Sequence, residues 1–448
     1  MAKLFGTDGV RGKANVYPMT PEIALKLGMA AAKVLKGNGS EFKIVIGKDT
    51  RLSGYMFENA LTAGLLSMGA NVLLVGPMPT PAIGHLTKSF AADGGIMISA
   101  SHNPPEDNGI KFFGADGFKI SDEKEEQIEK IVLETDVIEG KATGSKIGRA
   151  YRIDDARGRY IEYVKSAITN RSLKGLKVVL DCANGAGYSV APPILKELGA
   201  EVISINIQPT GVNINDGCGA VNPQEMQKKV QEVRADCGLA LDGDSDRVIM
   251  CDESGNIVDG DNIMAIIALD MNSRKMLSKK TFVATEYSNS GLDIAMKAQG
   301  INVIRAGTGD RHVLEEMKKR GLNFGGEKVG HIVLLDYSTA GDGILAGLFV
   351  LDILKRTGNK LSMLAASFKP LPMLQITVPV KNKTPLESFP HVQASILGAK
   401  KSLAGKGRVF VRYSGTENIV RILLEGPETG KLRRLGEKIE IAIKNSLG

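Results

Sequence analysis

A serine and a histidine stand side by side at Ser101 and His102, in a stretch whose composition suits an active-site turn. The apolar run Gly94–Ile98 before them is typical of a short buried strand. The prolines that follow Asn103 push the chain out of the helical conformation, so the strand should end in an abrupt turn that presents a hydroxyl. Taken alone, the same residues more often form an ordinary surface loop. The interpretation therefore depends on the other motifs of the chain.

Three carboxylates occupy alternate positions at Asp242, Asp244 and Asp246, directly after the apolar segment 239–241. Like charges this close repel one another unless a cation neutralises them. A set of oxygen ligands favours Mg²⁺ or another hard divalent ion. An exposed acidic turn is the plain alternative. A calcium-binding EF-hand is excluded because Arg247 stands where that loop requires glycine.

Two further stretches carry groups that could hold an anion or a sugar. Residues 412–417 and Arg421 combine hydroxyls, a glycine and two arginines, which suits a phosphate-binding nest, although Ser-Gly-Thr is also common turn chemistry. Residues 323–331 read as a flexible glycine-rich loop in which Glu327 and His331 could hold sugar hydroxyls. The segment 5–12 places Arg11 among glycines and would by itself be an N-terminal turn.

The elements that must position these residues follow a repeated order of strand and helix, which predicts mixed or parallel sheets covered by helices. Apolar periodicity predicts strands at 42–46, 71–75, 94–98, 177–180, 201–205, 239–241, 281–284, 302–304, 374–380, 409–412 and 420–424. It predicts helices at 21–36, 55–68, 159–169, 190–198, 224–235, 263–270, 292–299, 313–320, 392–403 and 431–446.

The repeats predict an α/β protein of four domains around a central cleft. Three are similar α/β domains with mixed sheets, and the last is a smaller C-terminal α+β domain. A proline-bearing linker at 368–372 precedes that last domain. The expected domains are a serine-bearing domain at 1–154, a metal-binding domain at 155–255, a sugar-binding domain at 256–368 and a phosphate-binding domain at 369–448.

Composition excludes several classes of function. The 448 residues carry a formal charge of +7 without a run of five or six basic residues, and there is no tryptophan, so we expect no nucleic-acid partner. No apolar stretch is long enough to span a bilayer, so we expect no membrane association. No apolar segment follows Met1, which predicts no signal peptide and a cytoplasmic location. The four cysteines lack metal-site spacing and are expected to be free thiols.

One chemical element falls in each expected domain: a serine, a metal loop, a hydroxyl-binding loop and an anion nest. This distribution suits phosphoryl transfer, which depends on positioning and charge neutralisation.

Four of these motifs, in this order, resemble those of the α-D-phosphohexomutase family over the whole chain. The family's phosphoserine, metal, sugar and phosphate loops are similar to Ala100–Pro104, Asp242–Arg247, Gly326–His331 and Arg412–Glu417. The segments Phe5–Gly12 and Leu335–Gly343 are most similar to the branch that acts on glucosamine phosphates. The resemblance implies an isomerase that interconverts glucosamine 6-phosphate and glucosamine 1-phosphate through a bisphosphate intermediate.

The resemblance also implies roles for individual residues. Ser101 would carry the phosphoryl group, with one Mg²⁺ per chain between it and Asp242, Asp244 and Asp246. Lys111 and His331 resemble the family's candidates for proton transfer, and Arg11 resembles a stabiliser of the transferring phosphoryl group. The substrate, a hexosamine phosphate, would contact Arg247, Glu327, Arg412, Ser414, Gly415, Thr416 and Arg421. Related enzymes are often dimers, so a homodimer is possible.

The chain departs from the family pattern at Val329, where serine is usual, and at Asn418, where proline is frequent. The missing hydroxyl at Val329 leaves the preferred sugar open. A phosphoglucomutase or phosphomannomutase of the same family is therefore the alternative enzyme. A phosphatase and a non-catalytic sugar-phosphate binding protein are further alternatives.

Overall fold

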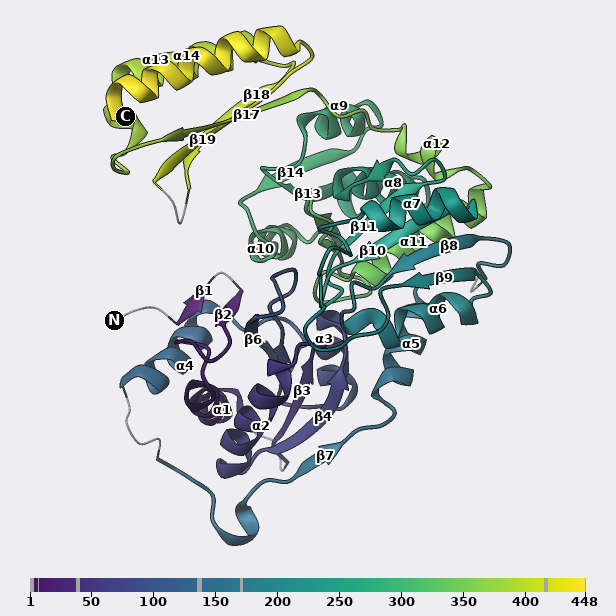
Figure 1. Ribbon diagram of the computed structural model, residues 1–448, viewed down its shortest axis with the longest axis vertical. Coiled ribbons are helices and arrows are strands. Elements are labelled where there is room, and N and C mark those ends of the chain that lie inside the picture. Colours follow the sequence, from purple (N-terminus) through teal and green to yellow (C-terminus); the bar gives the residue numbers. More distant parts are fainter. Residues whose placement is uncertain are drawn as a thin grey trace. The chain divides into compact units, whose positions relative to one another are not determined.

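The computed structural model describes residues 4–6, 8–37, 41–134, 139–169, 172–414 and 418–447. They divide into two compact units, Met1–Tyr287 with Ile304–Ala366, and Ser288–Val303 with Ser367–Gly448. Figure 1 shows the elements of both units with their labels.

The first unit begins with a seven-stranded mixed sheet of order β1-β2-β6-β5-β3-β4-β7. The central strands β5, β3 and β4 are parallel, whereas β6 runs antiparallel to β5. The strands are β1 (Phe5–Gly6), β2 (Gly9–Lys13), β3 (Lys43–Lys48), β4 (Asn71–Pro77), β5 (Gly94–Ile98), β6 (Asp107–Gly114) and β7 (Ala150–Arg152). The helices are α1 (Pro21–Leu35), α2 (Ser53–Ser67), α3 (Thr80–Ser89) and α4 (Asp122–Glu134).

Two smaller sheets of this unit repeat the same strand order. The first sheet contains the sequence β6-β5-β3-β4, the second β11-β10-β8-β9 and the third β16-β15-β13-β14. This shared order confirms the prediction of three similar mixed-sheet domains. The strands of the later sheets are β8 (Lys177–Asp181), β9 (Glu201–Ile205), β10 (Cys237–Leu241), β11 (Val248–Asp252), β12 (Ile257–Val258), β13 (Thr281–Thr285), β14 (Asn302–Ala306), β15 (Phe324–Gly326) and β16 (Ile332–Leu334).

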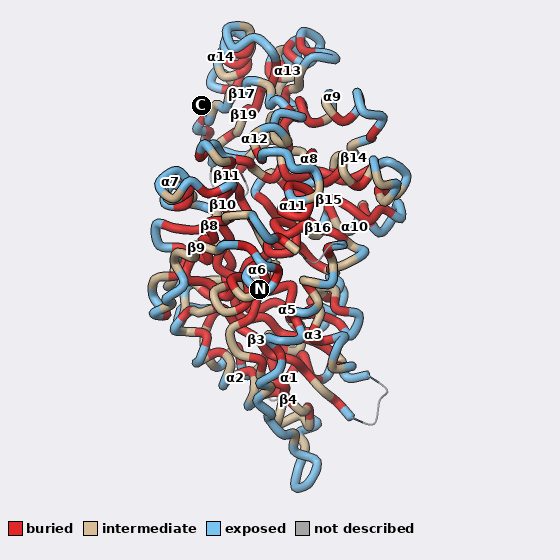
Figure 2. The backbone as a smooth tube through the Cα atoms, turned by 90° about the vertical axis from the view of Figure 1, so that its right-hand side faces the viewer, coloured by how far each residue is buried: buried red, intermediate tan, exposed pale blue. Residues whose placement is uncertain are grey.

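Helix α11 (Gly343–Thr357) forms much of the core beside the second and third sheets. Every residue from Gly343 to Leu354 is buried, and Figure 2 shows this helix within the buried part of the chain. It packs against α8 (Gly260–Ser273), β11 and β16. The remaining helices are α5 (Ala156–Ser166), α6 (Ala191–Glu197), α7 (Gln224–Val233), α10 (Asp310–Arg320) and α12 (Leu361–Ala365), with short 3-10 turns at Gly144–Lys146, Ala186–Ser189 and Ser278–Lys280.

The second unit is built on a three-stranded antiparallel sheet of order β17-β19-β18. Two amphipathic helices pack on this sheet and bury a core that includes Val378, Ile422 and Ile439. The elements are α9 (Ser290–Ala298), β17 (Met373–Pro379), a 3-10 turn at Leu386–Ser388, α13 (Pro390–Leu403), β18 (Arg408–Tyr413), β19 (Ile419–Glu425) and α14 (Thr429–Leu447). The prediction of a smaller C-terminal α+β fold is confirmed.

The sequence prediction missed the antiparallel strand that closes each of the three repeats, namely β6, β11 and β16. It also treated all of residues 323–331 as a flexible loop, whereas Phe324–Gly326 form strand β15 and residues 327–331 form the turn that follows it. Strands β15 and β16 pair antiparallel through Phe324↔Leu334, Gly325↔Val333 and Gly326↔Ile332, so Glu327 and His331 stand at a hairpin turn. A strand this short gives too few residues for a period-two pattern to be visible.

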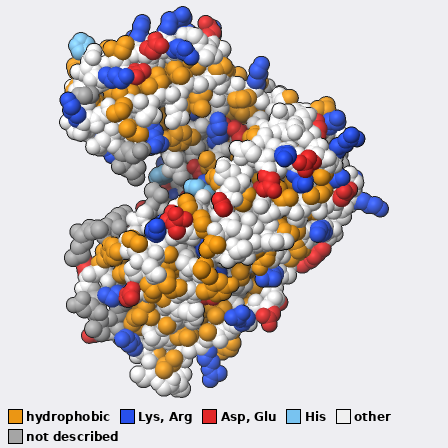
Figure 3. All heavy atoms as spheres, viewed as in Figure 1, with side chains coloured by type: hydrophobic (Ala, Val, Ile, Leu, Met, Phe, Trp, Pro, Cys, Tyr) orange, Lys and Arg blue, Asp and Glu red, His pale blue; other side chains and the backbone are white. Residues whose placement is uncertain are grey.

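On the face shown in Figure 3, basic and acidic side chains are interspersed and do not gather in one patch. Among the described residues, no helix is both long enough and apolar enough to cross a bilayer. All four cysteines are buried and unpaired, as the sequence predicts.

Candidate active site

Three loops of the first unit, each at the same place in its repeat, carry most of the predicted site residues. Each loop joins the third strand of its sheet to the antiparallel fourth: residues 99–106 between β5 and β6, 242–247 between β10 and β11, and 327–331 between β15 and β16. The loops contact one another. Ser101 Oγ donates to Asp242 Oδ2 over 2.7 Å, and Val248 N donates to Gly330 O over 3.1 Å.

Ser101 is buried, with 1% of its surface exposed, and has a left-handed backbone with φ of 52°. Residues other than glycine adopt this conformation at a cost, and such strain is common at functional sites. Its amide donates to Ser99 Oγ over 2.9 Å, and its hydroxyl lies 3.4 Å from His102 Nδ1. The loop therefore holds one hydroxyl in a fixed direction toward Asp242.

A buried ion pair that the sequence analysis missed shapes this serine loop. Arg51 is 0% exposed and its Nε donates to Asp49 Oδ2 over 2.9 Å. The same guanidinium donates to four backbone carbonyls of the loop, those of Ser101 at 3.0 Å, Asn103 at 2.8 Å, Asp107 at 3.1 Å and Pro104. The signal in the sequence was an Asp-x-Arg directly after strand β3, which alternation of apolar residues does not reveal.

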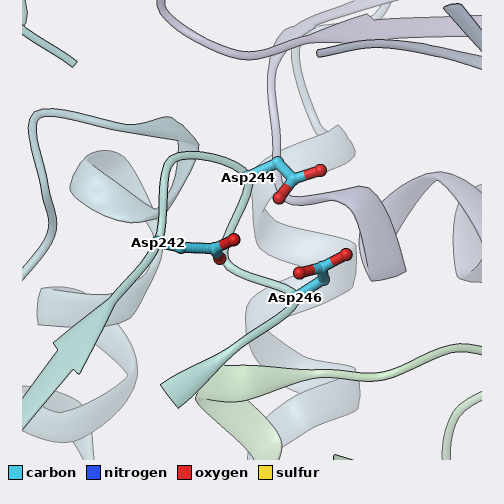
Figure 4. A group of neighbouring side chains, drawn as sticks. All are labelled: Asp242, Asp244 and Asp246. Carbon is cyan, nitrogen blue, oxygen red and sulfur yellow. The ribbon is translucent and has the colours of Figure 1, made fainter. Parts of the chain in front are cut away.

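The acidic triplet is a convergent, buried cluster. One carboxylate oxygen from each of Asp242, Asp244 and Asp246 lies within 4.8 Å of the others, and Figure 4 shows the three side chains turned toward a common space. Burial raises the pKa of Asp242 well above its ordinary value, and the charges of Asp246 and Asp244 raise it further. Asp244 Oδ1 and Asp246 Oδ1 are buried without a hydrogen-bond partner. These unsatisfied oxygens and the mutual repulsion fit a site for a hard divalent cation.

Lys111 places an ammonium group against the acidic cluster. Its Nζ lies 2.9 Å from Asp244 Oδ2, 3.9 Å from Asp246 Oδ2 and 3.2 Å from Asp8 Oδ2. Burial would lower its pKa, but Asp244 and Asp8 outweigh burial and raise it above the ordinary value. Arg11 pairs with Asp8 and reaches Ala100 O at 3.5 Å, so its guanidinium lies beside the serine loop.

The hairpin loop brings His331 and Glu327 to the same region. His331 Nδ1 lies 3.6 Å from Asp246 Oδ2, and despite burial the neighbouring carboxylate of Asp246 raises the pKa of His331 to about 9. Glu327 Oε1 accepts a hydrogen bond from Gly309 N over 3.2 Å. Arg247 Nε lies 3.7 Å from Asp246 Oδ1. The structure thus brings together the predicted residues of the first three domains.

The remaining predicted residues belong to the second unit. Arg412 of β18 pairs in register with Arg421 of β19, so two arginines stand directly opposite each other. Like charges in this position destabilise a sheet unless an anion lies between them. Ser414 follows β18, is 5% exposed and donates its amide to Ile419 O over 2.9 Å. Gly415 and Thr416 lie outside the described residues.

Comparison with known proteins matches all four domains to one family. Models of phosphoglucomutase/phosphomannomutase α/β/α domains I, II and III match residues 2–138, 158–255 and 259–371, and the model of the family's C-terminal domain matches 375–442. The chain belongs to the phosphoglucomutase/phosphomannomutase family. As a member of this family it is an isomerase of the phosphohexomutase type.

Two curated phosphohexomutases show how far the similarity extends. The phosphoglucosamine mutases of Pelobacter propionicus and Citrifermentans bemidjiense are both 52% identical to this chain, over 100% of its length and 99% of theirs.

Solved structures share the fold of this phosphohexomutase. A family protein from Burkholderia thailandensis gives a TM-score of 0.83 at 24% identity, covering 99% of this chain and 97% of its own. The N-acetylphosphoglucosamine mutase of Aspergillus fumigatus, solved with GlcNAc-6P and magnesium, gives 0.62 at 21% identity, covering 90% and 82%. At these identities the comparison supports the fold of the phosphohexomutase and no more.

Proposed function

We propose that this phosphohexomutase interconverts glucosamine 6-phosphate and glucosamine 1-phosphate, with Ser101 as the carrier of the phosphoryl group. The observation that carries the mechanism is the buried Ser101 hydroxyl, 2.7 Å from Asp242 Oδ2 in a cluster of three carboxylates. The choice of sugar is supported by the names of the curated relatives that match the full chain.

The reaction has two phosphoryl transfers, one from Ser101 to the sugar phosphate and one from the resulting bisphosphate back to Ser101. In the first half, the bond between phosphorus and Ser101 Oγ breaks and a bond to the free hydroxyl of the sugar phosphate forms, giving a bisphosphate. The hydroxyl proton of the sugar leaves, and Ser101 Oγ gains a proton. In the second half, the other phosphate of the bisphosphate returns to Ser101. Lys111 and His331, which both face Asp246, are the groups proposed to exchange these protons.

The acidic cluster would bind one Mg²⁺ per chain, and the residues that would hold the ion are Asp242, Asp244, Asp246 and Ser101. When bound, the ion supplies charge neutralisation and polarises the phosphoryl group. Arg11, beside the serine loop, and Arg247 would add positive charge where the three phosphoryl oxygens develop charge in the transition state.

Substrate binding is assigned to two groups of residues. Glu327, at the hairpin turn of the third repeat, would accept hydrogen bonds from sugar hydroxyls. The phosphate that does not react would be bound by Arg412, Ser414, Gly415, Thr416 and Arg421. Because the two phosphates of the intermediate exchange roles, the same residues serve both halves of the reaction. The homodimer and the cytoplasmic location stay predictions.

The decisive experiment is the intact mass of the purified protein before and after treatment with glucosamine 1,6-bisphosphate. We expect a gain of about 80 Da at Ser101, the mass of one phosphoryl group, which peptide mapping locates and which glucosamine 6-phosphate discharges. Ser101→Ala should show no gain and no turnover while it still binds the sugar phosphate. Normal turnover by Ser101→Ala would refute the phosphoserine mechanism.

A phosphoglucomutase or phosphomannomutase is the second candidate, and Val329 is the observation that favours testing it. This side chain is 49% exposed in the loop that carries Glu327, at a position where the family usually has serine. If only glucose or mannose phosphates discharge the phosphoenzyme, the chemistry stands and the glucosamine assignment is wrong.

A further inference from the structure

Six charged side chains of the first unit form a closed ring in which negative and positive groups alternate. Lys111 faces Asp246 at 3.9 Å and Asp8 at 3.2 Å. His331 faces Asp246 at 3.6 Å and Asp310 at 3.9 Å.

The ring closes through Lys119, whose ammonium pairs with Asp8 Oδ1 and with Asp310 Oδ2, the latter at 2.5 Å. Lys119, Asp8 and Asp310 belong to none of the roles assigned above.

Lys119 joins two domains. It follows the turn after β6 in the first sheet and forms an isolated bridge with Phe113, so its backbone belongs to the domain that carries Ser101. Asp310, its partner, is the first residue of α10 in the domain that carries His331. With 16% of its side chain exposed, Lys119 is enclosed largely by protein.

The turn before Lys119 is held by the third domain at independent points. Thr339 Oγ1 donates to Gly117 O over 2.6 Å, and Lys318 Nζ lies 3.3 Å from the centre of the Phe118 ring. Beyond this turn, Arg311 of α10 contacts Glu125 of α4 at 3.0 Å. These contacts join the two domains independently of Lys119. Its ammonium instead decides where the carboxylates of Asp8 and Asp310 lie.

We propose that Lys119 is a positioning residue for the phosphoryl-transfer reaction, because it holds Asp8 and Asp310 in the places that orient Lys111 and His331. This inference rests on the roles proposed above for Lys111 and His331. Without the ammonium, Asp8 would keep Arg11 and Lys111 among the described side chains. Asp310 would keep His331 and the hydrogen bond that Arg311 N donates to its Oδ1 over 2.9 Å. The two carboxylates would repel each other, and their movement would shift Lys111 within the contacts it keeps with Asp244 and Asp246 and draw His331 away from Asp246.

The test compares three variants. Lys119→Met removes the charge but keeps the length of the side chain, and Lys119→Arg restores a cation. Lys318→Met removes a cation from the same contact between domains but leaves the six charged side chains of the ring unchanged. With glucosamine 6-phosphate as substrate, we expect Lys119→Met to lose about 10- to 100-fold in kcat, the effect of misplacing a catalytic group by a fraction of an ångström to 1 Å. KM should change less than about threefold, since no substrate contact is removed.

The control variants separate positioning from docking. Lys119→Arg should recover most of the kcat, and Lys318→Met should keep it. A second measurement uses protein labelled with ¹⁵N-histidine, which gives signals from only five imidazoles. The His331 signal, identified by its absence in His331→Gln, should shift in Lys119→Met and stay in place in Lys318→Met.

Two outcomes would overturn the proposal. One is wild-type kcat in Lys119→Met, and the other is an equal loss in Lys119→Met and Lys318→Met with an unmoved His331 signal, which would reduce Lys119 to a docking contact. Failure of the proposed function is distinguishable, because it appears in the wild-type enzyme as turnover of glucose or mannose phosphates only. The imidazole signal needs no turnover and reports on Lys119 in either case.

Discussion

Replacing Arg51 by methionine should destabilise the first unit and disable the serine loop at once. The guanidinium is fully buried and makes five hydrogen bonds, one to Asp49 and four to carbonyls of the loop that carries Ser101. Asn215 Nδ2 also donates to the carbonyls of Ser101 at 2.9 Å and Asn103 at 3.2 Å, so those two keep a partner in the variant. Pro104 O likewise keeps the amide of Asp107 at 3.2 Å, and Asp49 Oδ2 keeps the hydroxyl of Ser99 at 2.6 Å. The carbonyl of Asp107 loses the guanidinium, and the buried charge of Asp49 loses the cation that compensates it.

The expected cost follows from these losses. Removing one partner of a buried ion pair costs about 3–5 kcal/mol, because the other charge stays buried without compensation. Burial raises the pKa of Asp49 even with Arg51 beside it, and loss of the cation should raise this pKa further, so protonation of the carboxyl as the pH falls limits the loss of stability. We therefore expect Arg51→Met to lower the free energy of unfolding by about 3–5 kcal/mol at pH 8 and by less at pH 5.

Urea unfolding, monitored by circular dichroism, measures this loss of stability. Two further variants identify the interaction that causes it. In Asp49→Asn/Arg51→Met the uncompensated charge is gone, so the double variant should be more stable than Arg51→Met by about 1–3 kcal/mol. Lys43→Met, at the start of strand β3, which precedes Arg51, serves as the control. Its ion pair with Glu41 is 3.5 Å long and largely exposed on the glutamate side, so its removal should cost at most about 1 kcal/mol.

Two results would refute this reasoning. A loss below about 1 kcal/mol for Arg51→Met would mean that water replaces the guanidinium, contrary to its complete burial. A double variant no more stable than Arg51→Met would mean that the buried charge of Asp49 is not the main cost. Turnover should fall with stability in Arg51→Met, because the serine loop loses the side chain that gathers its carbonyls.

Further predictions concern the acidic cluster, a buried acid and the sugar loop. Asp242→Asn removes a charge that burial and two neighbouring carboxylates oppose, so the metal-free variant should melt no lower than the wild type. An ion at 100 times its Kd should stabilise the wild type by about 2.7 kcal/mol and raise its melting temperature, whereas MgCl₂ should not raise that of the variant. An equal rise in both would place the metal elsewhere. Burial raises the pKa of Asp342 to about 6, so the folded state binds more protons than the unfolded state between pH 4 and 6 and loses stability as pH rises through this range. Asp342→Asn should therefore gain about 3 kcal/mol relative to the wild type between pH 4 and 7 in urea unfolding with EDTA, and parallel pH curves would contradict this. Val329→Ser should lower KM for glucosamine 6-phosphate by about 2- to 10-fold, the value of one added hydrogen bond, with unchanged stability; an unchanged KM would mean that this position does not face the sugar.

The sequence was most informative where chemistry is local. A tight turn after a buried strand brings carboxylates at alternate positions close together, and one oxygen of each of Asp242, Asp244 and Asp246 does lie close to the others. The period of the apolar residues likewise located most parallel strands and helices. The antiparallel fourth strands were missed because β6, with glycines at 109 and 114, and the three-residue β16 offer little pattern.

Partners far apart in the chain were beyond prediction from local patterns. Arg51 lies 50 residues before Ser101, and Lys119 lies 191 residues before Asp310. Single charged residues of this kind are usually solvated surface groups, and only the folded chain shows that Arg51 is buried and Lys119 enclosed. Val329 shows the opposite situation. The sequence alone reveals it as a departure from the family pattern, and a kinetic measurement is needed to determine its effect on the choice of sugar.

The placement of one loop per repeat has a consequence for synthesis on the ribosome. Domains generally fold as units, beginning with the N-terminal one. When the first domain leaves the ribosome, Asp244 and Asp246, the partners of Lys111 in the second domain, have not yet been synthesised. When these two carboxylates emerge, His331, the partner of Asp246 in the third domain, is still missing. A nascent chain shorter than about 330 residues therefore has a serine hydroxyl but no complete site around it, and its unmatched buried charges resist compact docking. Stalled chains of increasing length should accordingly change from protease-sensitive to protease-resistant in this region only after the third loop has emerged.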